Sequence, residues 1–149
     1  MRAVIQRVSN AKVEVDNKIV GAIEGGLVVY LSVGKEDTLD DVVFMAEKIV
    51  NLRIFADLED KMNLSVQDVS GAILLISQFT LHGDCRKGRR PGFDQSAPPE
   101  LARRLYEQTI DLIRQHGIKV ETGTFAAHMH VTSTNDGPVT FLLDSKRLF

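Results

Sequence analysis

Residues 72–93 read AILLISQFTLHGDCRKGRRPGF, and this stretch decides how the chain is organised. Its first five residues are all apolar, which is typical of a strand buried on both faces of a sheet. The run then breaks into Ser77, Gln78, Phe79 and Thr80. Buried strands that end in this way tend to present backbone and hydroxyl groups at the carboxyl edge of a sheet. We therefore predict a central strand that ends in a polar site.

A basic loop follows the polar group directly. It contains Arg86, Lys87, Arg89 and Arg90 within five positions. Such density suits the phosphates of a polyanion. A loop of this kind is often only a solvated surface, and the net charge of the whole chain is −2. Any binding of nucleic acid would therefore depend on this loop and not on the charge of the whole chain.

Composition indicates one globular domain covering residues 1–149. The chain is 44% apolar and 26% charged, and it has no apolar run near the ~20 residues that a membrane span requires. Residues 1–15 alternate like a strand rather than resembling a signal peptide. Cys85 is the only cysteine, which excludes an internal disulfide and fits a reducing compartment. We expect a cytoplasmic protein with no membrane partner.

The remaining patterns predict an α/β fold, a strand-rich mixed sheet with a barrel-like core and two main helices. One helix should start near residue 39, capped by Asp37 or Thr38, and the other after residues 96–100, ending at His116-Gly117. Apolar runs predict further strands at residues 3–8, 12–16, 18–23, 27–33, 118–121, 129–134 and 139–143. A turn at Asp16-Asn17 would join the second and third of these, and a turn at residues 135–138 the last two.

Two readings of the polar strand end stay open. The hydroxyls of Ser77 and Thr80 could simply cap neighbouring backbone groups. Alternatively, hydroxyls, an amide and backbone N–H groups could converge on a substrate carbonyl, as an oxyanion-stabilising site requires. A threonine nucleophile normally needs an adjacent base. His82 would share the face of Thr80 only if the strand continued, so these residues do not identify a nucleophile.

Three other features have competing readings. Gly137-Pro138 could form an ordinary turn, or a cis peptide whose carbonyls could accept hydrogen bonds from an ammonium group. His128 and His130 share a strand face, but no third ligand has a recognisable spacing, so we predict neither a metal nor a cofactor. Cys85 lies beside basic residues, yet as a nucleophile it would need a positioned partner.

The SQFTL segment at 77–81 and the NDGPVT segment at 135–140 occur together with MRAVIQRV at 1–8, RKGRRPGF at 86–93 and GTFAAHMHV at 123–131. In these segments the chain resembles the D-aminoacyl-tRNA deacylases of the bacterial and eukaryotic type over its full length. The resemblance implies hydrolysis of the ester between a D-amino acid and the terminal adenosine of tRNA. It also implies activity on glycine misattached to alanine tRNA, and a homodimer with sites at the subunit interface.

The resemblance further implies roles for single residues. Gly137 and Pro138 would enter the pocket of the other subunit, hold the α-ammonium and leave no room for an L side chain. Phe125 would pack against the adenosine or the pocket wall, and Met129 would shield the pocket. The SQFTL positions Ser77, Gln78, Phe79 and Thr80 would line it, and Arg86, Lys87, Arg89 and Arg90 would contact acceptor-stem phosphates, with no DNA partner.

Thr80 would be either a nucleophile or a structural residue beside a substrate hydroxyl that assists catalysis. Because no base has a defined place beside Thr80, we favour hydrolysis by water with backbone electrostatics. Two other classes remain as alternatives. One is a non-catalytic RNA-binding module, which the aromatic content of 6% disfavours. The other is a small-molecule hydrolase that uses Thr80 or Cys85 covalently.

Overall fold

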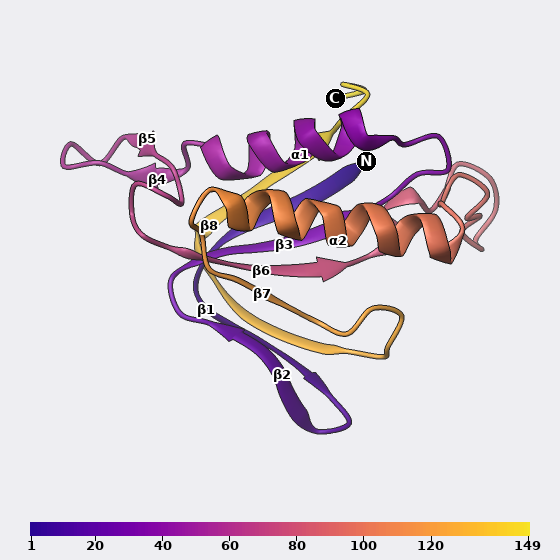
Figure 1. Cartoon of the computed structure of the whole chain (residues 1–149), viewed down its shortest axis with the longest axis horizontal. Coiled ribbons are helices and arrows are strands. Elements are labelled where there is room, and N and C mark those ends of the chain that lie inside the picture. The colour runs from indigo at the N-terminus through magenta and orange to yellow at the C-terminus, as the bar shows by residue number, and fades with distance from the viewer.

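The computed structural model describes all residues, 1–149, and shows a curved sheet with two helices on one face (Figure 1). No helix in it is both long enough and apolar enough to cross a membrane. The helices are α1 (Leu39–Asn51) and α2 (Pro99–Gln115), with a short 3-10 helix η1 (Phe79–His82). The strands are β1 (Arg2–Val15), β2 (Lys18–Ile23), β3 (Gly26–Ser32), β4 (Phe55–Ala56), β5 (Met62–Leu64), β6 (Ala72–Ser77), β7 (Val120–Thr122) and β8 (His130–Asp144).

The main sheet is mixed and nearly closes into a barrel. Its strands follow the order β2-β1-β3-β6-β7, with β8 paired to β1, while β4 and β5 form a separate hairpin. Strands β3, β6 and β7 are parallel to one another, and the other pairs are antiparallel. Gly21 of β2 lies so near β7 that a Cβ there would sit 2.5 Å from the Thr122 carbonyl oxygen. The predicted barrel-like core with two helices is therefore confirmed.

Strand β6 separates two apolar cores, which explains its uninterrupted apolar run. Ile73 and Leu75 face the larger core beneath α1 and α2, which lie side by side over the sheet (Figure 1). Leu74 and Ile76 face a smaller core inside the barrel. Because side chains of a strand alternate between faces, a strand between two cores must be apolar at every position.

The helix boundaries follow the predicted signals. The backbone N–H of Thr38 donates to Asp41 Oδ2 at 2.8 Å, closing a capping box at the start of α1. Pro99 begins α2, and Gly117 follows its end with φ +79°, the left-handed conformation that favours glycine. The hairpin turn at Asp16-Asn17 is also confirmed, with both residues at positive φ.

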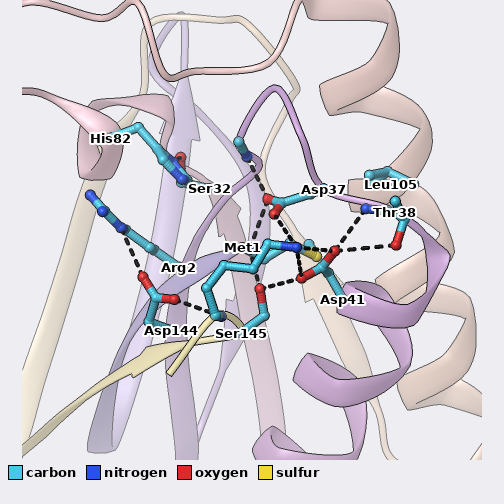
Figure 2. Close-up of polar contacts among 12 residues, drawn as sticks. Met1, Arg2, Ser32, Asp37, Thr38, Asp41, His82, Leu105, Asp144 and Ser145 are labelled. Atoms are coloured by element: carbon cyan, nitrogen blue, oxygen red, sulfur yellow. Dashed lines mark hydrogen bonds and ion pairs between the residues drawn. The ribbon is translucent and has the colours of Figure 1, made fainter. Parts of the chain in front are cut away.

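Both ends of the chain are attached to the start of α1 (Figure 2). The Met1 ammonium lies 2.7 Å from Asp37 Oδ2, and both groups are buried. Asp41 accepts hydrogen bonds from Ser145 Oγ at 2.6 Å and from Lys146 Nζ at 2.9 Å. Burial alone would raise the pKa of Asp41, but these bonds and that from the Thr38 backbone hold the pKa well below its usual range.

Two predicted interruptions are wrong. Residues 3–8 and 12–16 belong to one strand, β1, because Asn10 continues to pair with Thr134 between them. Residues 129–134 and 139–143 are likewise joined in β8 rather than separated by a turn. Asn135 pairs with Val8 and Thr140 with Gln6, so residues 136–139 bulge out opposite a single residue of β1.

The bulge in β8 is held in place by Arg7. Its Nε donates to the Asp136 carbonyl at 3.1 Å, and its Nη1 donates to the Ile54 carbonyl at 2.7 Å. Gly137 has φ +139°, and the Gly137-Pro138 peptide is cis. The bulge presents these two exposed residues on the surface without ending the strand.

Candidate functional site

A cavity of about 500 Å³ opens at the carboxyl ends of the parallel strands β3 and β6. Ser77, Gln78 and Phe79 of the SQFTL segment line one wall, and Phe125 and Met129 line another. The fold thus brings together five of the predicted site residues from two segments that are far apart in the sequence. The cavity lies at the sheet edge where the sequence predicted a polar site.

Thr80 does not line this cavity. The chain turns into η1 directly after Gln78, because the Leu81 N–H bonds to the Gln78 carbonyl and the Gly83 N–H to the Thr80 carbonyl. The Thr80 side chain is exposed, and its hydroxyl accepts a hydrogen bond from the Gln78 amide. His82 is buried instead, so the face shared by Thr80 and His82 on a continuing strand does not exist.

Phe125 is held from two sides at the cavity wall. Its ring centroid is 6.0 Å from that of Tyr106, and the Arg103 guanidinium lies over the ring at 4.9 Å. Tyr106 is buried, and its hydroxyl donates to the Leu75 carbonyl at 2.7 Å, so burial raises the tyrosine pKa above its usual value. Met129 packs at the edge of the barrel core. Both predicted wall residues are therefore half-buried beside the cavity.

Several lining residues were not anticipated from the sequence. They are mostly small, which keeps the cavity open, and include Ser32, Ser96, Ala97, Ala102 and Ala127. The pattern did contain a signal for Ser32. It is a hydroxyl residue inside the otherwise apolar run 27–33, and the parallel register pairs the preceding Leu31 with Ser77.

The basic loop is held next to Phe79, which lines the cavity. Backbone hydrogen bonds between Asp84 and Gly92, at 2.7 and 3.0 Å, close its base. Just beyond, the ring of Phe93 meets that of Phe79 edge-on, with centroids 5.1 Å apart. The loop therefore starts and ends beside η1.

The four basic residues of the loop are not equivalent. Arg86 is bound by Asp84 through contacts of 2.9 and 2.7 Å, and these hydrogen bonds hold the pKa of Asp84 well below its usual range. The other three, Lys87, Arg89 and Arg90, are exposed and form no ion pair. Three cations without an ion-pair partner are thus available on this loop.

A second, more polar cavity of about 540 Å³ lies next to η1. Arg2, His82, Cys85, Arg86 and Gln95 contribute to its lining. Cys85 is exposed there and is absent from the lining of the first cavity. The thiol and the SQFTL residues therefore belong to different sites.

Gly137 and Pro138 lie far from the cavity of their own chain. The bulge that carries them follows Asn135, which pairs with Val8, and Val8 pairs in turn with Gly26 at the start of β3. The cavity is at the other end of β3, at Ser32. The 7 residues of β3 separate these points by about 20 Å at the rise of a strand.

His128 and His130 meet edge-on, with ring centroids 5.1 Å apart. The structure contains no group of three or more histidine, cysteine or acidic side chains placed to hold a metal ion. Only His128 contributes to the lining of the first cavity.

Known proteins similar to this chain share both its sequence and its fold. A family model described as D-Tyr-tRNA(Tyr) deacylase matches residues 4–144. Proteins named D-aminoacyl-tRNA deacylase from Fervidobacterium nodosum and Thermosipho africanus are 64% and 60% identical over 149 residues, covering all of both chains. A solved structure titled c-Myc DNA Unwinding Element Binding Protein is 38% identical, with a TM-score of 0.91 over 97% of this chain and 98% of that one.

A second solved structure, of a probable eukaryotic D-amino acid tRNA deacylase, has a TM-score of 0.82 over 95% of this chain and 97% of that one. At 20% identity it shows the shared fold alone. The family model matches most of the chain, and the named relatives are similar to it over its full length. The chain belongs to the D-Tyr-tRNA(Tyr) deacylase family.

Proposed function

We propose that the protein hydrolyses the ester joining a D-amino acid to the terminal adenosine of tRNA, releasing free tRNA and the amino acid. The observation that supports this is the cavity at the ends of β3 and β6, together with three unpaired cations on the loop that starts and ends beside η1. Such a site can hold an aminoacyl-adenosine while the loop contacts the phosphates that follow it. Membership in the deacylase family supports the same reaction.

The chemistry relies on backbone groups and water. Phe79 and Thr80 open η1, and the first amides of a helix have no acceptor within it. These N–H groups face the ester carbonyl and stabilise the oxyanion, which is typically worth ~2.7–4 kcal/mol per donor. Water attacks, assisted by the 2′-hydroxyl of the substrate. Thr80 is not the nucleophile, since its hydroxyl is bound to Gln78 and the nearest histidine, His82, is engaged with Ser32.

Chiral selection comes from Gly137 and Pro138 of a second subunit. Their position far from the cavity of their own chain supports a role in trans. Their carbonyls hold the α-ammonium, and their bulk excludes an L side chain. Glycine has no side chain to exclude, so glycyl-tRNA is also a substrate, including glycine misattached to alanine tRNA.

A homodimer has suitable surface available. Phe79 is 57% exposed at the cavity mouth, and Phe141 and Leu142 are 38% and 58% exposed on β8. Strand β8 pairs only with β1, so its other edge is free to meet another chain. Since the proposed substrate is charged tRNA, we expect the protein to act in the cytoplasm.

The decisive experiment follows ester loss from matched D- and L-aminoacyl-tRNA. Rapid release from the D ester and from glycyl-tRNA, with the L ester spared, is expected. Tight tRNA binding without ester loss would identify an RNA-binding module instead. Complete inhibition by a thiol reagent would point to covalent chemistry at Cys85, which the separate location of that thiol disfavours.

A further inference from the structure

Two buried polar side chains meet beside the SQFTL wall. Ser32 ends the central strand β3 with no exposed surface, and His82 ends η1 with 8% exposed. Ser32 Oγ lies 2.6 Å from His82 Nδ1. Figure 2 draws both side chains, next to each other. The chemistry described above assigns neither residue a role, yet buried polar pairs of this kind hold what they touch in one geometry.

One further hydrogen bond connects this pair to the SQFTL wall of the cavity. The Ser32 hydroxyl donates to the Phe79 carbonyl at 3.3 Å. A serine hydroxyl has a single proton, so in this arrangement, with that proton in the bond to Phe79, His82 Nδ1 carries the proton that joins the two side chains. Burial lowers the pKa of His82, and the positive charge of the nearby Arg2 guanidinium lowers it further. The ring is therefore neutral near pH 7, and with its proton on Nδ1 it has none on Nε2.

The last acceptor in this series of hydrogen bonds is the Phe79 carbonyl. The same peptide group contains the Thr80 N–H, one of the proposed oxyanion donors. The Phe79 carbonyl and the Thr80 N–H belong to one planar trans peptide and point in opposite directions. Fixing the carbonyl therefore fixes the direction of the N–H. Ser96 Oγ also reaches the Phe79 carbonyl at 3.4 Å, and Arg2 Nη1 donates to the Leu81 carbonyl at 3.1 Å, so η1 is tied down along its length.

We infer that Ser32 and His82 are positioning residues for ester hydrolysis. The hydrogen bonds from His82 to Ser32 and from Ser32 to Phe79 direct the Thr80 N–H toward the developing oxyanion. This inference rests on the proposed deacylase function. Misplacing a donor by a fraction of an ångström weakens transition-state stabilisation more than substrate binding. The two side chains would therefore act on kcat and leave KM nearly unchanged.

The test compares three variants with a matched control. Ser32→Ala and His82→Phe each remove at least one of these hydrogen bonds, whereas His82→Asn keeps an N–H donor near the Nδ1 position. Thr109→Val is the control, since it removes another fully buried hydroxyl, one that donates to the Leu105 carbonyl at 2.8 Å within α2. We expect kcat on D-aminoacyl-tRNA to fall about 10-fold or more for Ser32→Ala and His82→Phe. KM should stay within about 3-fold, and His82→Asn should recover most of the rate.

The double variant adds a second criterion. Ser32→Ala combined with His82→Phe should lose no more rate than the worse single variant, because both act through the same peptide. Equal losses for Thr109→Val and Ser32→Ala, or a loss seen only in KM, would show that the pair is merely structural.

Two measurements do not depend on turnover. Nitrogen NMR of the wild-type protein should show the Nδ1–H tautomer at His82, and the opposite tautomer overturns the inference even if every variant misfolds. Amide exchange at residues 79–83 should accelerate in Ser32→Ala but not in Thr109→Val. If the wild-type protein fails to hydrolyse D-aminoacyl-tRNA, the proposed function fails, whereas an active wild type with unaffected variants removes only the role of the pair.

Discussion

At the scale of single residues, the polar side chains of residues 77–82 point in three directions. Ser77 and Gln78 line the cavity, while the Thr80 side chain points to solvent and His82 is buried beside the wall. The change from strand to 3-10 helix after Gln78 produces this division, because side chains no longer alternate across a sheet. The backbone amides of η1, rather than the threonine hydroxyl, are therefore the groups that we propose to stabilise a carbonyl.

Replacement of Thr80 by alanine tests this assignment. We expect Thr80→Ala to keep deacylase activity within about 10-fold of the wild type, because the backbone N–H groups and the substrate hydroxyl remain. Single-turnover hydrolysis of D-aminoacyl-tRNA is the measurement, with circular dichroism as a check on folding. Loss of about 10³-fold or more in a folded variant would make Thr80 a nucleophile.

The protonation of His82 should affect stability at mildly acidic pH. Its lowered pKa means that the unfolded chain binds a proton more readily than the folded one, so the unfolding free energy should decrease as pH falls below about 6.5. Arg2 and the Met1 ammonium oppose a charge on the ring, while Asp37 and Asp144 favour it. Urea unfolding from about pH 7.5 to about pH 5 should show a shallower decline in His82→Asn than in the wild type. Parallel curves would refute this.

At the scale of elements, the approach of β2 to β7 closes the barrel around its small core. Gly21 makes this possible, since its Cα lies against the Thr122 backbone where no side chain fits. On its other side β2 pairs with β1, to which the Asp16-Asn17 turn joins it. A single glycine in the strand therefore sets how far the sheet can curl.

Gly21→Ala should destabilise the protein by about 1–3 kcal/mol, because the added methyl forces β2 and β7 apart. Gly25→Ala is the matched control, since a Cβ there meets nothing within 4 Å, and its effect should stay below about 1 kcal/mol. Urea denaturation of both variants measures the difference. Equal stabilities would mean that the barrel tolerates a wider opening between β2 and β7.

The basic loop has a separate prediction. Replacing Lys87, Arg89 and Arg90 by glutamine should raise KM for tRNA and make the activity less sensitive to salt, with the salt slope falling by about one per lost phosphate contact. Preference for the D ester should not change. The control replaces Lys18, Lys61 and Lys119, which are exposed elsewhere, and gives the same change in net charge. Equal effects of the two triple variants would remove the assigned role of the loop.

At the scale of the whole molecule, one chain keeps the two parts of the proposed site apart. The cavity wall lies at one end of β3, and Gly137-Pro138 lies about 20 Å away beside the other end. A second copy can supply the other part if β8 and the cavity mouth meet across an interface. Phe79, Phe141 and Leu142 are the exposed apolar residues available for such a contact.

Mixed dimers can decide whether selection acts in trans. One subunit carries Phe79→Pro, which removes an oxyanion donor at a position where proline is compatible with the start of a helix. The other carries Gly137→Ala and Pro138→Ala, and its own homodimer should hydrolyse L esters too. In a mixed dimer acting in trans, the one active cavity faces an intact Gly137-Pro138 and should spare the L ester. Hydrolysis of both enantiomers by the purified mixed dimer would instead place selection within one chain.

The pattern of apolar and polar residues determined much of this protein. The continuous apolar runs of β3 and β6 follow from burial between two cores, and the capping box at Thr38 and the glycine after α2 set helix ends through local geometry. The polar break at Ser77 likewise placed the cavity at the correct sheet edge. These features depend on residues close together in the sequence or on the face of one element. The order of apolar and polar residues along the chain is therefore enough to predict them.

Only the tertiary structure decided the rest. Residues 135–138 look like a turn, but Arg7 and the continued pairing with β1 hold them as a bulge inside one strand. Burial of His82 against Ser32, and the separation of Cys85 from the SQFTL cavity, likewise depend on contacts between residues far apart in the chain. Local propensity carries no information about such contacts, because their free energy exists only once distant strands have paired.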